Sequence, residues 1–337
     1  MTEEKLEPRG EDPAPGRYVR PQDIDNRSTL FQRFLWRIEA LAWDLLYWER
    51  MKSRSAEEAS DLGAKLMRRL GPLTAAHRTT LRNIRLAFPD WDEAGVNTVA
   101  LRAWENVGRI AGEMPHLADF DPDRRDGRLV ILGEERLEHI ARSGRPAVII
   151  SGHFANWELV AAVLSRRLSN CQITYRAANN PFIDRRIARA RYAYGVHVLT
   201  PKGAGTRDLM RALSRGRAVA LMNDQKFNQG IPAPFFGHEA MTAPGPSRLA
   251  LRYACPLIPV TTSRIGPARY CVTVHDPIEP PPGLEGALAV SDMVARINRF
   301  MEARIREAPE QWFWMHNRWP KEAWVKAGVM NSRRPGG

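Results

Sequence analysis

Two side chains that can move and hold a proton lie five residues apart in the segment Ser151-Gly-His-Phe-Ala-Asn-Trp-Glu158. His153 can take a proton from a substrate hydroxyl group, and Glu158 can fix the imidazole tautomer and stabilise the imidazolium that forms. Such a pair activates a hydroxyl without a nucleophile supplied by the protein. Spacing alone leaves a structural alternative open, in which His153 hydrogen-bonds the backbone of a turn and Glu158 complements a helix dipole.

A strand, a sharp turn and a helix must position this pair. Residues 147–151 are apolar enough for a central strand, and Gly152 permits a sharp exit from it. Asn156 is a good N-cap for the helix that follows. Side chains five residues apart on one continuous helix would face different ways. A histidine in the turn before the helix can instead fold back over the first helical turn and meet Glu158, where backbone N–H groups can also hold an oxyanion.

From residue 128 onward, short runs rich in Val and Ile alternate with amphipathic helical stretches. This pattern predicts an α/β fold with a mostly parallel central sheet flanked by helices, preceded by a helical N-terminal region. The predicted strands cover residues 129–132, 147–151, 172–175, 197–200, 218–222, 257–262 and 270–274. The predicted segments are a disordered polar leader at 1–28, a helical membrane-proximal region at 29–125, the α/β domain at 126–327 and a flexible tail at 328–337.

Polar side chains follow several of the predicted strands at the point where each strand ends. His153 follows one strand, Arg176 the next and Lys202 the one after. Asp224 and Gln225 follow the strand after that. In open α/β sheets, ligands bind beyond the carboxyl ends of the strands. The sequence therefore predicts a ligand site at this edge of the sheet.

Metal and serine-hydrolase chemistry are not indicated. His153 has no second histidine nearby, and the cysteines Cys171, Cys255 and Cys271 match no zinc spacing. The signature G-x-S-x-G does not occur. We therefore expect no metal and no cofactor.

The front of the chain predicts an amphipathic helix over residues 29–50, rich in Trp and Tyr. Four charged residues interrupt this stretch: Arg33, Arg37, Glu39 and Asp44. Each charge at the centre of a bilayer costs roughly 2.5–3.5 kcal/mol. A helix that lies in the membrane interface is therefore favoured over a membrane-spanning one, and a helix simply packed on the protein is the alternative.

A net charge of +12 and a pI near 10.1 imply an anionic partner. Acidic lipid head groups, an acidic protein and nucleic acid are the candidates, but no helix-turn-helix, RNA-recognition or zinc-finger signature supports nucleic acid. One predicted helix carries a group of cations that either meet lipid phosphates or an acidic carrier protein or form a solvated face: Arg185, Arg186, Arg189 and Arg191. A non-catalytic lipid-binding module is a further alternative.

Blocks of sequence in a fixed order give the chain a specific resemblance. They are His153-Phe-Ala-Asn-Trp-Glu158, Tyr175-Arg-Ala-Ala-Asn-Asn-Pro-Phe-Ile-Asp184, Asn223-Asp-Gln225 and Pro234-Phe-Phe-Gly237, with Leu86-Ala-Phe-Pro89 upstream and Pro309-Glu-Gln-Trp-Phe-Trp-Met-His316 downstream. Together they resemble the bacterial lipid A biosynthesis lauroyl/myristoyl acyltransferases, the late acyltransferases. That family is in turn similar to the phosphatidylinositol mannoside acyltransferases.

The resemblance implies transfer of a fatty acyl group from acyl-acyl carrier protein, or acyl-CoA, to a hydroxyl of a lipid A precursor, with a lysophospholipid or glycolipid as the alternative acceptor. It makes His153 the general base and Glu158 its orienting acid. It implies substrate contacts at Arg176, Asn180, Asp184, Asp224, Gln225, Phe236 and Gly237. A structural salt bridge for Arg176 and a structural cap for Asp224 are the alternatives. The implied place is a membrane surface, the cytoplasmic face of the cell inner membrane, without nucleic acid as a partner.

Overall fold

The computed structural model describes residues 29–330 apart from residues 125, 197–198 and 202–205. The predicted leader at 1–28 and most of the predicted tail at 328–337 lie outside the described residues, and so does Lys202.

In the described part of the chain, a seven-stranded sheet has the order β1-β9-β8-β2-β5-β3-β4. Its strands are β1 (Leu129–Leu132), β2 (Ala147–Ser151), β3 (Gln172–Tyr175), β4 (Leu199–Pro201), β5 (Ala218–Met222), β8 (Leu257–Gly266) and β9 (Arg269–Val274). The pair β8–β9 is antiparallel, and the other pairs of this sheet are parallel. The predicted mostly parallel sheet is therefore confirmed, with β2 near its centre.

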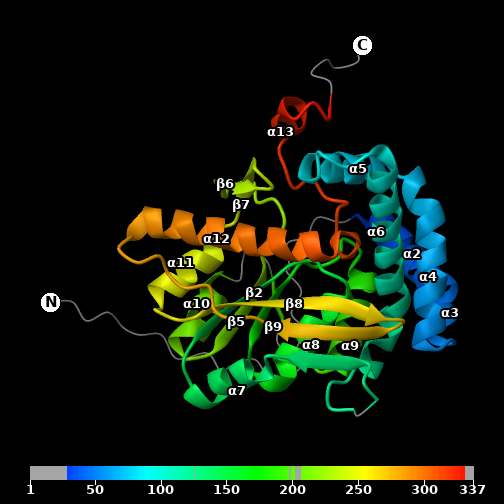
Figure 1. Ribbon diagram of the computed structural model, residues 1–337. Helices are drawn as coiled ribbons and strands as arrows, with labels where there is room; N and C mark the ends of the chain where they lie inside the picture. The colour runs from blue at the N-terminus through cyan, green and yellow to red at the C-terminus, as the bar shows by residue number, and fades with distance from the viewer. Residues whose placement is uncertain (1–28, 125, 197–198, 202–205, 331–337) are drawn as a thin grey trace.

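Alternate residues of β2 pack on opposite faces of the sheet. Val148 and Ile150 belong to one hydrophobic cluster, while Ala147 and Ile149 belong to the other. The first cluster includes residues of α10 (Thr206–Ser214), α11 (Gly245–Arg252) and α12 (Gly286–Glu307), and the second includes residues of α7 (Glu134–Ser143) and α8 (Glu158–Arg167). Figure 1 shows α12 on one side of the sheet and α7 on the other. Because strand side chains alternate, a strand with both faces covered is apolar throughout.

The N-terminal region is helical, as predicted. It contains α2 (Leu30–Ala42), a π-helix (Trp43–Trp48), α3 (Glu49–Lys52), α4 (Ala56–Leu70), α5 (Ala75–Ala87), α6 (Glu93–Glu113) and a 3₁₀ helix (Met114–Asp119). The α4 helix begins with a capping box in which Ser55 and Glu58 satisfy each other's backbone N–H groups. Of the described helices, none is both long enough and apolar enough to cross a bilayer.

The helices α4 and α6 approach so closely that their contact requires glycine. A Cβ atom on Gly63 would lie 2.0 Å from the carbonyl oxygen of Gly108, and one on Gly112 would lie 2.1 Å from that of Ala59. This close packing brings the polar side chains of the two helices together near the end of α6. One of them, Glu113, faces the α/β part of the protein.

The polypeptide after β5 forms an element that the strand pattern did not predict. β6 (Ile231–Phe235) and β7 (His238–Thr242) make an antiparallel hairpin. Its turn holds Phe236 at φ 50° and Gly237 at φ 72°. Two prolines in β6, Pro232 and Pro234, lower its apparent strand propensity, but a strand paired on one side tolerates proline. Further along the chain are a 3₁₀ helix (Pro309–Gln311) and α13 (Lys321–Lys326).

Candidate active site

The parallel pairing of β2 with β5 brings two of the predicted polar residues together. Ser151 lies opposite Met222 at the carboxyl ends of these strands, and the backbone N–H of Asn223 donates to the carbonyl of Ser151. The chain then delivers His153 from β2 and Asp224 from β5 to the same point. The structure therefore brings these two predicted residues together at this edge of the sheet, and the carboxylate that contacts His153 comes from the neighbouring strand.

The side chain of Asp224 contacts both the ring and the backbone of His153. Its Oδ1 lies 2.8 Å from Nδ1 of His153, and its Oδ2 accepts the backbone N–H of His153 at 2.7 Å. The indole N–H of Trp312 donates to the same Oδ2 at 2.8 Å. Burial alone would raise the pKa of the fully buried Asp224, but the adjacent His153 outweighs it and holds that pKa well below its usual range. Asp224 is therefore an ionised acceptor.

This contact determines which nitrogen of His153 can act as a base. An ionised carboxylate only accepts hydrogen bonds, so Nδ1 carries the proton in the contact with Asp224. Nε2 then presents its lone pair, and it lies 3.4 Å from Nε2 of Gln225. The aromatic rings of Trp157 and Phe313 flank the imidazole, with centroid distances of 5.0 and 6.1 Å. The histidine is thus held in one orientation with a single basic nitrogen available.

The expected contact between Glu158 and Nδ1 of His153 is not what the structure shows, because Asp224 occupies that nitrogen. Glu158 is the first residue of α8, and it pairs with α9 (Pro181–Ala193). Its carboxylate accepts two hydrogen bonds from Arg191, at 2.7 and 2.8 Å, and one from the hydroxyl of Tyr194 at 2.9 Å. Burial would raise the pKa of Glu158, but the charge and hydrogen bonds of Arg191 outweigh it and lower that pKa.

The start of α8 also differs from the prediction. Trp157, rather than Asn156, precedes the first helical residue, and the side chain of Asn156 donates to Glu113 instead of capping the helix. Ala155 takes a left-handed conformation, with φ 42°. Glu158, at the start of this helix, has Arg191 and Tyr194 as its hydrogen-bond partners.

A cavity of about 330 Å³ is lined by His153 and by Gln225, whose amide nitrogen lies beside Nε2 of that histidine. The polar lining of the cavity comes from the strand ends, the first turn of α8 and the last turn of α9, and includes Ser151, His153, Glu158, Arg176, Arg191 and Gln225. Its apolar lining comes from the strand interiors and the later turns of α8, and includes Ile149, Val160, Ala161, Leu164, Ile173, Leu199 and Ala220. A ligand that fits this lining has a polar reacting group and an apolar chain.

The other predicted substrate contacts divide into two groups. Arg176 and Gln225 line the cavity, and the side chain of Arg176 is exposed at its mouth. Asn180 instead caps α9 by accepting from the N–H groups of Phe182 and Ile183, and its amide donates to Glu39 and to the carbonyl of Trp36. These contacts attach α2 to α9.

Three more predicted contacts lie outside the cavity lining. Asp184 is buried and accepts the backbone N–H of Ala178 at 2.7 Å. Phe236 and Gly237 form the turn of the β6–β7 hairpin, where Phe236 packs on Phe88. The structure thus places these residues in contacts that support the fold.

The predicted cationic group on α9 is only partly directed to solvent. Arg191 is committed to Glu158, and Arg186 forms an ion pair with Asp44 of the N-terminal region. The guanidinium of Arg185, which is exposed, lies 5.3 Å from the ring centroid of Phe182. Among the described residues, no group of three or more His, Cys, Asp and Glu side chains is arranged to hold a metal ion.

Sequence reasoning missed three residues of the site: Arg191 as the partner of Glu158, Tyr194 beside it, and Trp312 as a donor to Asp224. Arg191 was grouped with its cationic neighbours because helical spacing does not reveal which member faces inward. Trp312 lies in the block 309–316, and the signal that could have found it is that the N–H of a buried indole usually has a hydrogen-bond partner.

The structure thus combines a mostly parallel α/β fold with a histidine oriented by Asp224 beside a cavity whose lining is partly apolar. The chain belongs to the bacterial lipid A biosynthesis acyltransferase family, because the model of that family matches residues 34–321. It is an acyltransferase. It is 27% identical over 241 residues to the lipid A biosynthesis lauroyltransferase of Escherichia coli K12, covering 70% of this chain and 76% of that protein.

Two further relatives show the range of the similarity. The lipid A biosynthesis palmitoleoyltransferase of Escherichia coli K12 is 26% identical, again over 70% of this chain and 76% of the relative. The phosphatidylinositol mannoside acyltransferase of Mycolicibacterium smegmatis is 25% identical over 48% of this chain and 53% of its own length.

Proposed function

We propose that this enzyme transfers a fatty acyl group from a thioester donor, acyl-acyl carrier protein or acyl-CoA, to a hydroxyl group of a lipid A precursor. The observation that carries the proposal is that His153 lines the cavity with its Nδ1 held by Asp224 and its Nε2 beside Gln225, which also lines the cavity. Membership of the lipid A acyltransferase family supports the acceptor class. The cavity volume of about 330 Å³ lies in the range of small-molecule sites and suits part of an acyl chain.

In the proposed reaction, Nε2 of His153 removes the proton of the acceptor hydroxyl while the oxygen attacks the thioester carbonyl carbon. A carbon–oxygen bond forms and a tetrahedral oxyanion results. The carbon–sulfur bond then breaks, and the thiolate takes the proton back from Nε2. The ionised Asp224 stabilises the imidazolium between these steps, which replaces the role first expected of Glu158.

Glu158 and Arg191 contribute in a different way. Their ion pair joins the first turn of α8 to α9 at the polar part of the cavity. We propose that this ion pair determines the shape and the charge of the cavity wall, and that it takes no part in proton transfer. Arg176, exposed at the mouth, is the proposed contact for an anionic group of the donor or the acceptor.

The exposed face of α2 and the π-helix supports a membrane surface as the place of reaction. Its large apolar side chains are between 42% and 85% exposed, and they are Leu30, Phe31, Phe34, Leu35, Ile38, Leu41, Leu45 and Leu46. We call them the α2 face. A contiguous apolar face of this kind, joined to basic residues, is typical of helices that lie in a membrane interface. We propose that it places the enzyme on the cytoplasmic face of the inner membrane.

A different acceptor is the second candidate, and the similarity to the phosphatidylinositol mannoside acyltransferase favours it. The same base and cavity would serve a hydroxyl of a glycolipid or a lysophospholipid, since the polar part of the acceptor binds outside the acyl cavity. Mass spectrometry of membrane lipids from cells with and without the enzyme separates these cases. Loss of one acyl chain from lipid A supports the first acceptor, and loss from another lipid supports the second.

The chemistry is tested with purified enzyme and a lipid A precursor. We expect His153→Ala to lower turnover about 10²- to 10⁴-fold, the usual contribution of a general base. The matched control is His139→Ala, on α7 outside the cavity lining, which is expected to retain normal turnover. Near-normal turnover of His153→Ala would contradict the proposed mechanism.

A further inference from the structure

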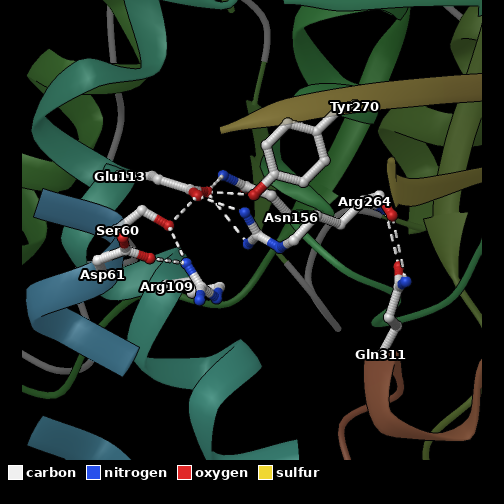
Figure 2. A network of polar contacts seen from close by, with 8 residues as sticks. All are labelled: Ser60, Asp61, Arg109, Glu113, Asn156, Arg264, Tyr270 and Gln311. Atoms are coloured by element: carbon white, nitrogen blue, oxygen red, sulfur yellow. Dashed lines mark hydrogen bonds and ion pairs between the residues drawn. The ribbon is translucent and has the colours of Figure 1, made fainter. Parts of the chain in front are cut away.

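The end of α6 carries another buried carboxylate, Glu113, whose side chain is 0% exposed. It accepts hydrogen bonds from Ser60 of α4 at 2.7 Å and from Arg264 of β8 at 2.6 Å. The hydroxyl of Tyr270 of β9 and the amide of Asn156, at 2.9 Å, also donate to it (Figure 2). The carboxylate therefore joins the N-terminal helices, the sheet and the loop that carries His153.

The loop of His153 is attached to this cluster at consecutive residues. Asn156 donates directly to Glu113, and the backbone N–H of Ala155 donates to the carbonyl of Gln311 at 2.7 Å. Gln311 is in turn fixed by Arg264, because its Oε1 accepts the backbone N–H of Arg264 at 2.8 Å and its amide faces the carbonyl of Arg264 (Figure 2). The carbonyl of His153 accepts the N–H of Phe313 at 3.1 Å. One arginine thus supports both anchors of the loop.

The conformation of the loop needs this support. Ala155 lies at φ 42°, in the left-handed region that residues with a Cβ rarely adopt. Such a conformation persists only when the surrounding contacts determine it. Releasing Asn156 and Ala155 would let the turn relax, and His153, two residues away, would then move relative to Asp224. A general base tolerates little displacement from its productive geometry.

We propose that Glu113 is a positioning residue for acyl transfer, which holds His153 in place through Asn156 and Arg264 from outside the cavity. The inference rests on the proposed role of His153 as the base. A carboxylate suits this place because it accepts from four donors at once, including the positively charged Arg264. An amide offers one accepting oxygen, and its NH₂ group would face donors.

Asn156→Ala is the cleanest test, because it removes the link to the loop and leaves the contacts of Glu113 with Ser60, Arg264 and Tyr270. We expect kcat to fall about 10- to 100-fold, as for a small displacement of a catalytic group, while KM and the melting temperature change little. Glu113→Gln should lower kcat at least as much. When Asn156→Ala and Glu113→Gln are combined, the fold-losses in kcat of the two single variants should not multiply, because both substitutions act through the same contact.

Asp61→Asn is the matched control, since this half-exposed carboxylate pairs with Arg109 at the margin of the same cluster (Figure 2). It should keep the wild-type kcat. If Glu113→Gln does not fold, Asn156→Ala decides alone. Wild-type kcat in Asn156→Ala, or losses that multiply in the double variant, would overturn the proposal.

Turnover of His153→Ala, measured beside these variants, distinguishes failure of the proposed function from failure of the positioning role of Glu113. Near-normal turnover of His153→Ala would overturn the proposed function itself. Lost turnover in His153→Ala with normal kcat in Asn156→Ala would overturn the positioning role alone.

Discussion

Glu158 and Asp224 are both buried carboxylates close to His153, but they have different partners. Asp224 comes from the end of β5 and contacts the imidazole and the backbone of His153. Glu158 comes from the start of α8 and contacts Arg191 and Tyr194 of the neighbouring chain segment. The difference teaches that proximity in sequence did not decide which acid contacts the imidazole of His153. The pairing of adjacent parallel strands did.

The largest expected effect is a difference in kcat between variants of the two acids. Asp224→Asn should lower kcat on the order of 10³-fold or more, because an amide neither fixes the Nδ1 tautomer reliably nor stabilises the imidazolium. Glu158→Gln should lower kcat much less, because its partner is Arg191. Steady-state acyl transfer by the two purified variants measures this. Equal losses, or a larger loss in Glu158→Gln, would break the comparison.

Glu158→Gln should instead lower stability, because it leaves the charge of Arg191 without its partner in a largely buried place. Breaking one side of a buried ion pair costs about 3 kcal/mol in the free energy of unfolding. Replacing Arg191 by Met in the same protein should restore part of that loss. Urea denaturation of the single and double variants measures both. If the double variant is less stable than Glu158→Gln, the unpaired charge of Arg191 is not the cause of the lost stability.

The apolar part of the cavity can be narrowed without touching either acid. Ala161→Leu adds bulk to the wall formed by α8. We expect the preference for shorter acyl chains over longer ones to rise about tenfold, since one methylene group in an apolar pocket is worth roughly 1–3 kcal/mol. Competition between donors of different chain length measures this ratio. An unchanged ratio would show that the acyl chain lies elsewhere.

The smallest expected effect is the pH dependence of stability. The folded state holds the pKa of Asp224 below its usual range, so its ionised form stabilises the fold. That contribution is fully present above the pKa of the unfolded state, about 3.9, and is lost as pH falls further. The advantage of wild type over Asp224→Asn in unfolding free energy should therefore shrink as the pH falls from about 4 to about 2, toward the lowered pKa of the folded state. An advantage that stays constant over this range would contradict the assignment.

The sheet could be predicted closely from the sequence, because Val- and Ile-rich runs identified strands such as Ala147–Ser151 and Ala218–Met222. The polar residues after these strands also predicted that the candidate site lies at the carboxyl ends of the strands. Their order across the sheet did not follow, and therefore the contact of Asp224 with His153 could not be predicted. Glu113 was equally hidden, since its partners Ser60, Arg264 and Tyr270 lie far from it in the chain.

The central claim is that Asp224 holds His153 so that Nε2 is the base. Nitrogen NMR of protein with ¹⁵N-labelled histidine tests it directly, with the ring of His153 assigned by comparison with His153→Gln. We expect that the neutral ring carries its proton on Nδ1, that Glu158→Gln preserves this tautomer, and that Asp224→Asn disturbs it. A proton on Nε2 in the wild-type protein, or a tautomer that changes with Glu158 and not with Asp224, would contradict it.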